Sequence, residues 1–245
     1  MLKRKAPRLL GSFGVTSRFY SSVAEVYPVN VASSDMENFR LNIMLPTMKP
    51  EKIYGGITTA ISVAKNLIRE LPDNIDIRVL ITSDTVDKAS IDELAKRLGR
   101  NFTLVAPNED LSGATMVDLA ERRHLPVSLR TKDIFFATAW WTADLAFRLR
   151  EAQVEVYGGA RPILYLIQDF EPGFYPWSNH YALSEATYSH SDSTIALINS
   201  EELASYMDKR YAFKQVYCIP YSLHKGIACN LRPTVKEKII LVYGR

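Results

Sequence analysis

Cysteine and histidine are scarce in this chain of 245 residues, which contains two cysteines and four histidines. The two thiols, Cys218 and Cys229, do not make a disulfide framework in a chain of this length. No CxxC pair or Cys/His cluster has the spacing of metal ligands. The sequence therefore predicts no metal site and a reducing, cytoplasmic setting.

Long apolar runs and glycine-rich nucleotide fingerprints are also missing. No apolar stretch reaches the roughly 18 residues expected of a membrane-spanning helix. The first predicted strand is followed neither by the GxGxxG fingerprint of dinucleotide-binding folds nor by the lysine of a P-loop. The net charge is only +3, and the basic residues are not concentrated along a folded face, so no nucleic-acid partner is expected.

The first 34 residues differ in composition from the rest of the chain. Five basic residues precede the first acidic residue, Glu25, and six serines lie in this stretch. Three interpretations stay open: a basic arm lying on a membrane, an organelle transit peptide, and a helix or tail packed on the domain. In the first case residues 1–24 contact a membrane surface, and the protein is peripheral on the inner face of the plasma membrane.

Short apolar runs then alternate with segments of helical periodicity. Strands are expected at 41–45, 77–81, 102–106, 133–137, 163–167, 194–198, 216–219 and 239–242, and helices at 58–71, 90–98, 141–151, 181–188 and 201–206. This rhythm is typical of an α/β fold with a Rossmann-like doubly wound parallel sheet. Ligands of such sheets bind beyond the carboxyl ends of the strands, so segments that directly follow a strand are the candidates for a site.

The first candidate segment joins the first strand to the first helix and contains the pair Gly55 and Gly56. Glycines at this point let the backbone approach a ligand closely, and a helix N-terminus offers free N–H groups to an anion. The alternative is that the two glycines only shape a tight turn between strand and helix.

The second candidate segment holds two adjacent tryptophans, Trp140 and Trp141, where the strand at 133–137 runs into a helix. At a helix start one of two neighbouring side chains faces the core while the other faces the cleft. We therefore take Trp141 as a candidate for the cleft side. The alternative is that both are core aromatics.

The third candidate segment, residues 168–177, has two carboxylates, an amide and four aromatic side chains directly after a strand. Carboxylates and amides bind the paired hydroxyls of sugars, and aromatic rings cover the apolar side of the sugar ring. The candidate sugar-binding residues of this loop are Gln168, Asp169, Glu171, Phe174, Tyr175 and Trp177. The alternative is a rigid loop, shaped by its prolines, whose aromatics seal the core.

Five segments, in this order along the chain, resemble family four of the glycosyltransferases, which have the GT-B architecture. Gly55–Ile57 and Gln168–Trp177 resemble the corresponding segments of the WsaF-type rhamnosyltransferases of bacterial polysaccharide assembly, and Asn199–Leu203 is similar to the family's N-S-E-x-L. Val216–Leu223 resembles the V-x-V-I-P-N-G-V where the N-terminal domain hands over to the C-terminal one. Ile239–Arg245 resembles the I-L-Y-V-G-R of the first donor-domain strand. The resemblance covers about residues 38–245.

The resemblance implies transfer of a sugar from a nucleotide-sugar donor to a saccharide or lipid-linked glycan acceptor, with retention at the anomeric carbon and without a metal or cofactor. The WsaF-type relatives imply that rhamnose is the transferred sugar and that its donor is a dTDP-linked nucleotide sugar. The N-terminal domain of this family holds the acceptor, and its first loop contacts the donor phosphates. The residues that match this loop are Gly55, Gly56, Ile57 and Thr58. The family's catalytic cations belong to the second domain, so no catalytic residue is named and this chain alone is expected to be inactive.

The resemblance also divides the chain into four parts. These are a basic extension (1–36), a Rossmann-like acceptor-binding domain (37–222), an interdomain linker (223–236) and the first strand of a donor-binding domain (237–245). Two positions depart from the family: Trp141 stands where many relatives have a histidine near the donor sugar, and Tyr221 and Ser222 replace the asparagine and glycine of the handover segment. Two other functions stay open, a non-catalytic carbohydrate-binding α/β module and an unrelated Rossmann-type nucleotide-binding enzyme.

Overall fold

The computed structural model describes residues 23–120, 122, 124–219, 225–230, 232, 235 and 238–240. Residues 1–22 of the predicted basic extension lie outside the described residues. So do Tyr221 and Ser222 of the predicted handover segment and much of the predicted linker and last strand. None of the helices in the described part of the chain is long and apolar enough to cross a membrane.

Eight parallel strands form the central sheet, in the order β10-β9-β8-β7-β2-β3-β5-β4. The strands are β2 (Arg40–Leu45), β3 (Asp76–Ile81), β4 (Thr103–Val105), β5 (Ala114–Asp118), β7 (Asp133–Ala137), β8 (Ile163–Ile167), β9 (Thr194–Ile198) and β10 (Gln215–Cys218). A separate parallel pair joins β1 (Val31–Ser33) to β6 (Val127–Leu129). This arrangement confirms the doubly wound α/β fold.

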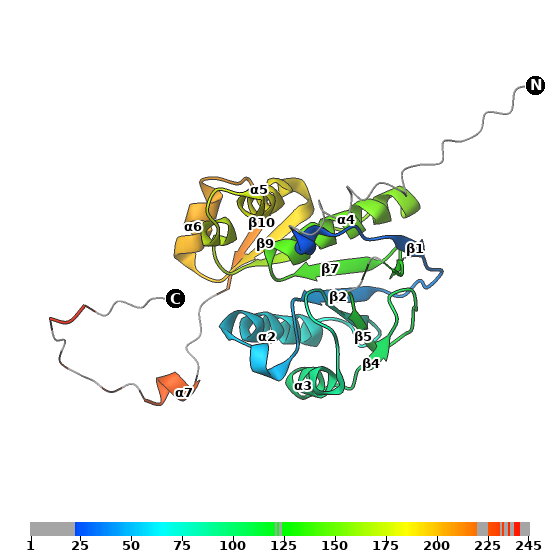
Figure 1. Cartoon of the computed structure of the whole chain (residues 1–245), viewed down its shortest axis with the longest axis horizontal. Coiled ribbons are helices and arrows are strands. Elements are labelled where there is room, and N and C mark those ends of the chain that lie inside the picture. Colours follow the sequence, from blue (N-terminus) through cyan, green and yellow to red (C-terminus); the bar gives the residue numbers. More distant parts are fainter. Residues whose placement is uncertain are drawn as a thin grey trace, which may run out of the picture.

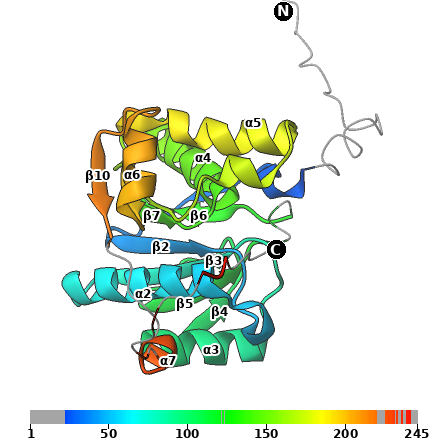
Figure 2. The same ribbon diagram turned by 90° about the vertical axis from the view of Figure 1, so that its left-hand side faces the viewer.

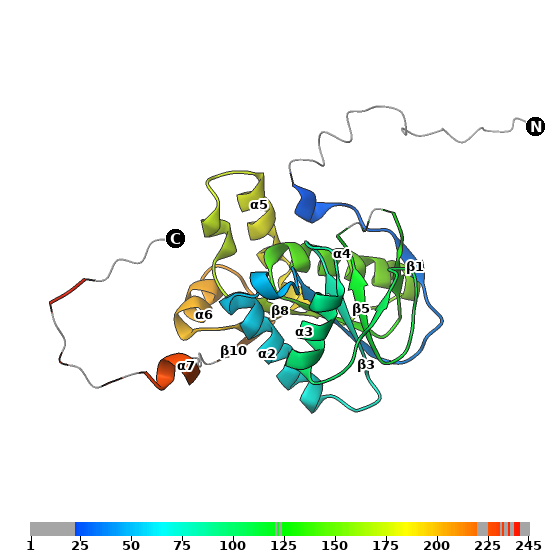
Figure 3. The same cartoon turned by 60° about the horizontal axis from the view of Figure 1, so that its bottom comes forward.

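Helices cover both faces of the central sheet (Figure 1). The α-helices are α2 (Gly55–Glu70), α3 (Lys88–Leu98), α4 (Trp140–Tyr157), α5 (Asn179–Ala186), α6 (Glu201–Asp208) and α7 (Lys225–Ala228), and the short 3-10 turns are η1 (Ala24–Val26), η2 (Pro50–Lys52), η3 (Glu171–Phe174), η4 (Thr187–Ser189) and η5 (Ser191–Ser193). Helices α2 and α3 lie side by side on one face (Figure 3), whereas α4, α5 and α6 lie on the other (Figure 2).

The neighbouring strands β2 and β7 mark the switch point of the sheet. The helix that follows β2 lies on one face, and the helix that follows β7 lies on the other. The loops after these two strands therefore diverge and leave a crevice at the carboxyl edge, which is where open α/β sheets bind their ligands.

The apolar core has two parts, one on each face of the sheet. Leu41, Ile43 and Leu45 of β2 pack in the part that α2 and α3 cover, whereas Met44 packs in the part under α4. All six residues of β2 are buried. Because successive side chains of a strand point to opposite faces, the apolar run at residues 43–45 suits a central strand that is covered on both faces.

Most helix ends follow local sequence signals. The side chains of Asp87, Ser178 and Ser200 accept hydrogen bonds from backbone N–H groups in the first turns of α3, α5 and α6, and Gly99, with φ of 71°, ends α3. Helix α2 is different, because its N-cap residue, Tyr54, provides no side-chain cap. The first N–H groups of α2 therefore have no partner within the helix and none from the N-cap side chain.

A buried ionic cluster lies at the amino ends of β2, β3 and β7, at the edge of the sheet opposite to the switch-point crevice. The cluster consists of Arg40, Arg78, Arg130, Asp76, Asp110 and Asp133. Arg40 donates to both carboxylate oxygens of Asp133, at 2.7 and 2.8 Å, and Arg130 donates to Asp76 at 2.6 Å. The three positive and three negative charges balance, which is the condition for holding charges away from water.

Three differences from the sequence predictions concern strands and a helix start. Ile239 and Ile240, expected in a strand, belong to none and are 72% and 90% exposed, and residues 241–242 lie outside the described part. A strand needs a neighbour to pair with, and no described strand pairs with these two residues. Strands β1, β5 and β6 were not predicted. Helix α2 begins at Gly55 instead of Thr58, so the glycine pair forms its first turn.

Candidate functional site

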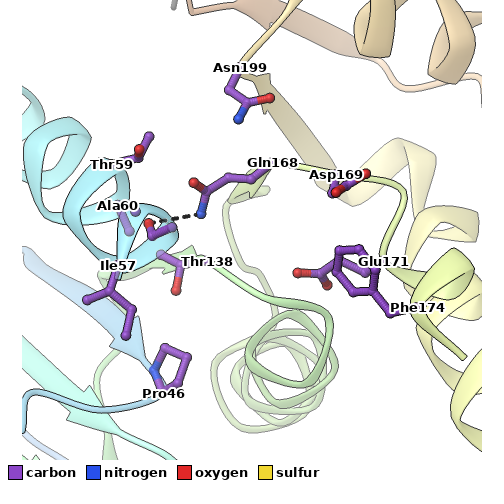
Figure 4. Close-up of a pocket in the computed structure, with 12 residues that line it drawn as sticks. Pro46, Ile57, Thr59, Ala60, Thr138, Gln168, Asp169, Glu171, Phe174 and Asn199 are labelled. Atoms are coloured by element: carbon purple, nitrogen blue, oxygen red, sulfur yellow. Dashed lines mark hydrogen bonds between the residues drawn. The ribbon is translucent and has the colours of Figure 1, made fainter. Parts of the chain in front are cut away.

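A pocket of about 440 Å³ opens at the carboxyl edge of the sheet, beside the switch point (Figure 4). Its walls are the first turns of α2 and the segments that follow β2, β7, β8 and β9. Pro46, Thr138, Gln168 and Asn199 are each the first residue after one of these strands, and all four line the pocket. The size and position are those of a small-molecule site in a doubly wound fold.

Seven of the predicted site residues line this pocket. They are Gly55, Gly56, Ile57, Gln168, Asp169, Glu171 and Phe174. Thr58 is not among the lining residues, although its neighbours Thr59 and Ala60 are. Trp141, Tyr175 and Trp177 also lie outside the lining. Two segments that are more than 110 residues apart in the sequence thus meet in one pocket.

The α2 wall of the pocket consists of backbone and small side chains. A Cβ atom built on Gly55 meets no atom within 4 Å, and one built on Gly56 comes no closer than 3.6 Å to the Gln168 side chain. Neither glycine has a positive φ, so backbone strain does not require them. Their missing side chains instead leave the N–H groups of the first turn accessible, as anion-binding helix starts do.

Gln168 connects the two walls of the pocket. Its Nε2 donates a hydrogen bond of 3.1 Å to the carbonyl oxygen of Gly56, which Figure 4 draws as a dashed line. The loop after β8 is thereby attached to the first turn of α2. The sequence placed these residues in two separate motifs, and only the fold brings them into contact.

Glu171 holds the start of α4. Its Oε2 accepts a hydrogen bond of 2.5 Å from the backbone N–H of Trp140, the first residue of that helix. The carboxyl group points into the pocket, toward the wall that carries Thr138 (Figure 4). The pKa of this carboxyl is raised to about 7, because burial and the nearby Asp169 raise it by more than the hydrogen bond from the Trp140 N–H lowers it.

The two tryptophans are placed differently. Trp140 is fully buried, and its Nε1 donates to the hydroxyl of Tyr175 at 3.0 Å. Trp141 is partly buried, packs edge-on against Trp140 with ring centroids 5.7 Å apart, and leaves its Nε1 without a hydrogen-bond partner. Tyr175 therefore supports the start of α4 through the side chain of Trp140. A contact between Trp141 and a ligand stays a prediction.

Exposed aromatic side chains flank the pocket. Phe174, which lines it, is 50% exposed, and Trp177, three residues further along the same loop, is 84% exposed. The Trp177 ring packs against that of Tyr181 at 5.1 Å. Tyr54, directly before the glycine pair, is 73% exposed. Large exposed rings on or near the segments that line a pocket are typical of ligand-binding surfaces.

Pro46, Thr138 and Asn199 line the pocket but were not among the predicted site residues, although Asn199 begins one of the family motifs. The signal was present, because each directly follows a predicted strand. Thr138 donates from its Oγ1 to the carbonyl oxygen of Met44 at 2.7 Å, so its hydroxyl also ties the loop after β7 to β2. Within the described residues, no group of three or more His, Cys, Asp or Glu side chains is arranged to hold a metal ion.

Comparison with known families gives one match. Residues 40–201 match the family model described as WsaF, N-terminal domain. This range contains every residue that lines the pocket. No curated protein sequence matches the chain at a significant level.

Proposed function

Because the chain belongs to the family of WsaF N-terminal domains, a glycosyltransferase-type family, we propose that it is the acceptor-binding part of an enzyme that moves a sugar from a nucleotide-sugar donor to a saccharide acceptor. The specific donor is a dTDP-linked rhamnose, the configuration at the anomeric carbon is retained, no metal takes part, and the product is a polysaccharide or glycan. One observation carries the proposal: the uncapped start of α2 and the acidic, aromatic loop after β8 share a single pocket.

The α2 wall suits the diphosphate of a donor. The first turn of α2 contains no acidic residue, and its N–H groups receive no side-chain cap. A helix start of this kind attracts anions through its free N–H groups and the positive end of the helix dipole. The glycine pair leaves room for a phosphate group to approach the backbone.

The opposite wall suits the acceptor sugar. Asp169 and Glu171 present carboxyl oxygens that can accept hydrogen bonds from the hydroxyls of the acceptor sugar, and the half-exposed ring of Phe174 offers an apolar face. Sugars present both kinds of surface, because their hydroxyls project from a ring whose C–H groups are apolar. The reacting groups of donor and acceptor then meet between the two walls.

The leaving diphosphate needs positive charge beyond a helix start. No lysine or arginine of the described residues lines the pocket. Stabilisation of charge in the transition state is a large part of enzymatic rate enhancement, so the missing cations are assigned to a second, donor-binding domain. This chain alone is accordingly expected to bind saccharide without transferring sugar.

Two measurements test the function. Saturation-transfer NMR on this chain, with methyl glycosides of rhamnose, mannose, glucose and galactose, is expected to show saccharide binding. The full-length protein is expected to transfer rhamnose from dTDP-rhamnose to a rhamnose-containing acceptor. Saccharide binding without transfer from any nucleotide sugar would indicate a non-catalytic carbohydrate-binding module. Binding of NAD with no saccharide binding would indicate a different Rossmann-type enzyme.

The proposed location is the inner face of the plasma membrane. The basic residues of the first 24 positions attract anionic lipid, and a lipid-linked glycan acceptor is presented at such a surface. Only Val23 and Ala24 of this stretch belong to the described residues. Val23 is buried against the domain, so the membrane-contacting part is assigned to the residues before it.

A further inference from the structure

Glu171 has one oxygen committed to the fold and one available to a ligand. Oε2 receives the N–H of Trp140, whereas no described residue donates a hydrogen bond to Oε1. The carboxyl group points into the pocket (Figure 4). Glu171 is partly buried and lines the pocket, so a ligand or water that enters the pocket can donate a hydrogen bond to Oε1.

Among the described residues, no lysine, arginine or histidine acts on the Glu171 carboxylate to hold it ionised. The titratable groups that act on it or that it acts on are Asp169, Tyr165, Tyr175 and Tyr188. The α2 wall opposite carries no charged side chain in its lining. Helix α5 also packs on η3 and carries His180. The His180 ring lies 5.2 Å from the Tyr175 ring, centroid to centroid, and its Nε2 lies 3.8 Å from Oε2 of Glu25.

This arrangement is not what capping α4 requires. A helix start is satisfied by a neutral side-chain oxygen, and Thr142 already accepts the N–H groups of Thr138 and Ala139 through its Oγ1 at 2.8 and 2.9 Å. An amide at position 171 would also offer an oxygen to the Trp140 N–H. Capping of α4 accounts for Oε2 but not for Oε1, and strongly perturbed carboxyls in clefts are typical of functional sites.

We propose that Glu171 is the proton-linked recognition group of the pocket: under mildly acidic conditions its carboxyl group is protonated in the empty pocket, and it loses that proton to solvent when a saccharide hydroxyl donates a hydrogen bond to the carboxylate. The inference rests on the proposed saccharide-binding function and adds the residue and the protonation state that select the ligand. A hydrogen bond to a charged acceptor is stronger than one to a neutral acceptor, so the bound sugar favours the ionised form. No bond of the sugar breaks in this step.

The pKa of about 7 sets the range in which the linkage operates. Below it the empty pocket holds the proton, and binding must displace it. Affinity for saccharide then falls by about fivefold from pH 7 to pH 6 and by about tenfold for each further pH unit, and it is constant above about pH 8, where the carboxyl is already ionised. Recognition of the acceptor would thus be weakened by mild acidification without unfolding of the domain.

Isothermal titration calorimetry on this chain tests the linkage directly, with the methyl glycoside that binds best in the NMR panel. Titrations at pH 6 in phosphate and in Bis-Tris, which differ in ionisation enthalpy, measure the protons released. We expect nearly one proton per saccharide from the wild-type chain, and about fivefold weaker binding at pH 6 than at pH 7. Glu171→Gln should release none and bind with an affinity that does not change between pH 6 and 8.

Two matched variants serve as controls. Asp73→Asn removes an exposed carboxylate away from the pocket lining, and His180→Asn removes the nearby imidazole, and both should keep the proton release and the pH dependence. Wild-type binding that releases no proton, or a Glu171→Gln chain that still releases one, overturns this inference but leaves the proposed function standing. A wild-type chain that binds no saccharide at any pH overturns both.

Discussion

At the scale of single residues, Glu171 acts on the fold in two opposite ways. Its Oε2 supports the start of α4, but its charge is desolvated. Since the folded-state pKa of about 7 lies above the ordinary value of 4.5, the group stabilises the fold below about pH 4.5. That contribution is lost as the pH rises through 7. A ligand-binding role and the stability of the empty protein therefore conflict at this residue.

Replacement of Glu171 by Gln should reveal this conflict. The amide keeps an oxygen for the Trp140 N–H and removes the desolvated charge, so the variant is expected to gain stability relative to wild type as the pH rises from 5 to 8. The gain should be roughly 1–3 kcal/mol. Urea unfolding at both pH values measures it. A variant that is less stable by the same amount at both pH values would show that Glu171 is a cap and nothing more.

Asp133 has the opposite pH signature. It accepts hydrogen bonds from Arg40, Asn42 and the N–H of Arg130, and these partners hold the pKa of its carboxyl below the ordinary value although burial opposes them. Its contribution to stability is therefore present above about pH 4 and lost as the pH falls through the lower, folded-state pKa.

The Asp133→Asn substitution should destabilise the domain by about 3–5 kcal/mol at neutral pH, because it leaves buried arginines without their counter-charge. Chemical denaturation of the variant beside wild type measures the loss. The matched control is Asp73→Asn at an exposed position, where less than about 0.5 kcal/mol is expected. A loss below 1 kcal/mol for Asp133→Asn would contradict a structural role of the cluster.

Single residues were predictable where one rule applied, the position directly after a strand. The rule selects Gln168 in the sequence. Applied to every predicted strand, the same rule also selects Thr138 and Asn199. The contact between Glu171 and Trp140 joins residues 31 positions apart, and no local pattern encodes it. The ionic cluster was missed for a similar reason, because its members come from four separated segments and pair only after the sheet has formed.

At the scale of elements, the start of α2 combines weak local stability with an open approach to the pocket. Glycine is a poor helix former, and neither Gly55 nor Gly56 is required by a positive φ or by a backbone clash. The chain thus carries two helix-weakening residues where alanine would fit. Accessibility of the first-turn N–H groups accounts for them.

The Gly55→Ala substitution is expected to stabilise the domain by about 0.4–1 kcal/mol and, in the full-length protein, to weaken binding of dTDP. Thermal unfolding and calorimetric titration with dTDP measure the two effects. Gly159→Ala is the control, because Gly159 also has open space around its Cβ position and no positive φ but lies away from the pocket lining. Unchanged dTDP affinity in the Gly55 variant would argue against a phosphate at α2.

Elements with uniform apolar runs were predictable to the residue, as the strands Asp133–Ala137, Ile163–Ile167 and Thr194–Ile198 show. Strand β5 was missed because Thr115 and Asp118 interrupt its apolar pattern, although Met116 and Val117 are fully buried between its neighbours. Strands β1 and β6 have three residues each, which is too short for a periodic signal. Pairing with each other, which the sequence does not show, stabilises them.

At the scale of the whole molecule, the basic extension should add membrane affinity that the folded domain lacks. The full chain is expected to sediment with vesicles containing anionic phosphatidylserine at low salt and to dissociate as salt is raised. A chain without residues 1–22 should bind markedly less. The cut spares Val23, which is buried. Equal sedimentation of the two chains would assign the extension another role.

The two edges of the sheet differ in their side chains and in their role. The amino edge holds the balanced arginine and aspartate charges, and the carboxyl edge holds the pocket. Since the two regions share no side chain, substitutions in the pocket loops leave the ionic cluster intact, and effects at such distant sites usually add. If the pocket binds the acceptor sugar as proposed, grafting the segment after β8 from another chain of the same fold is expected to exchange its specificity without redesign of the scaffold.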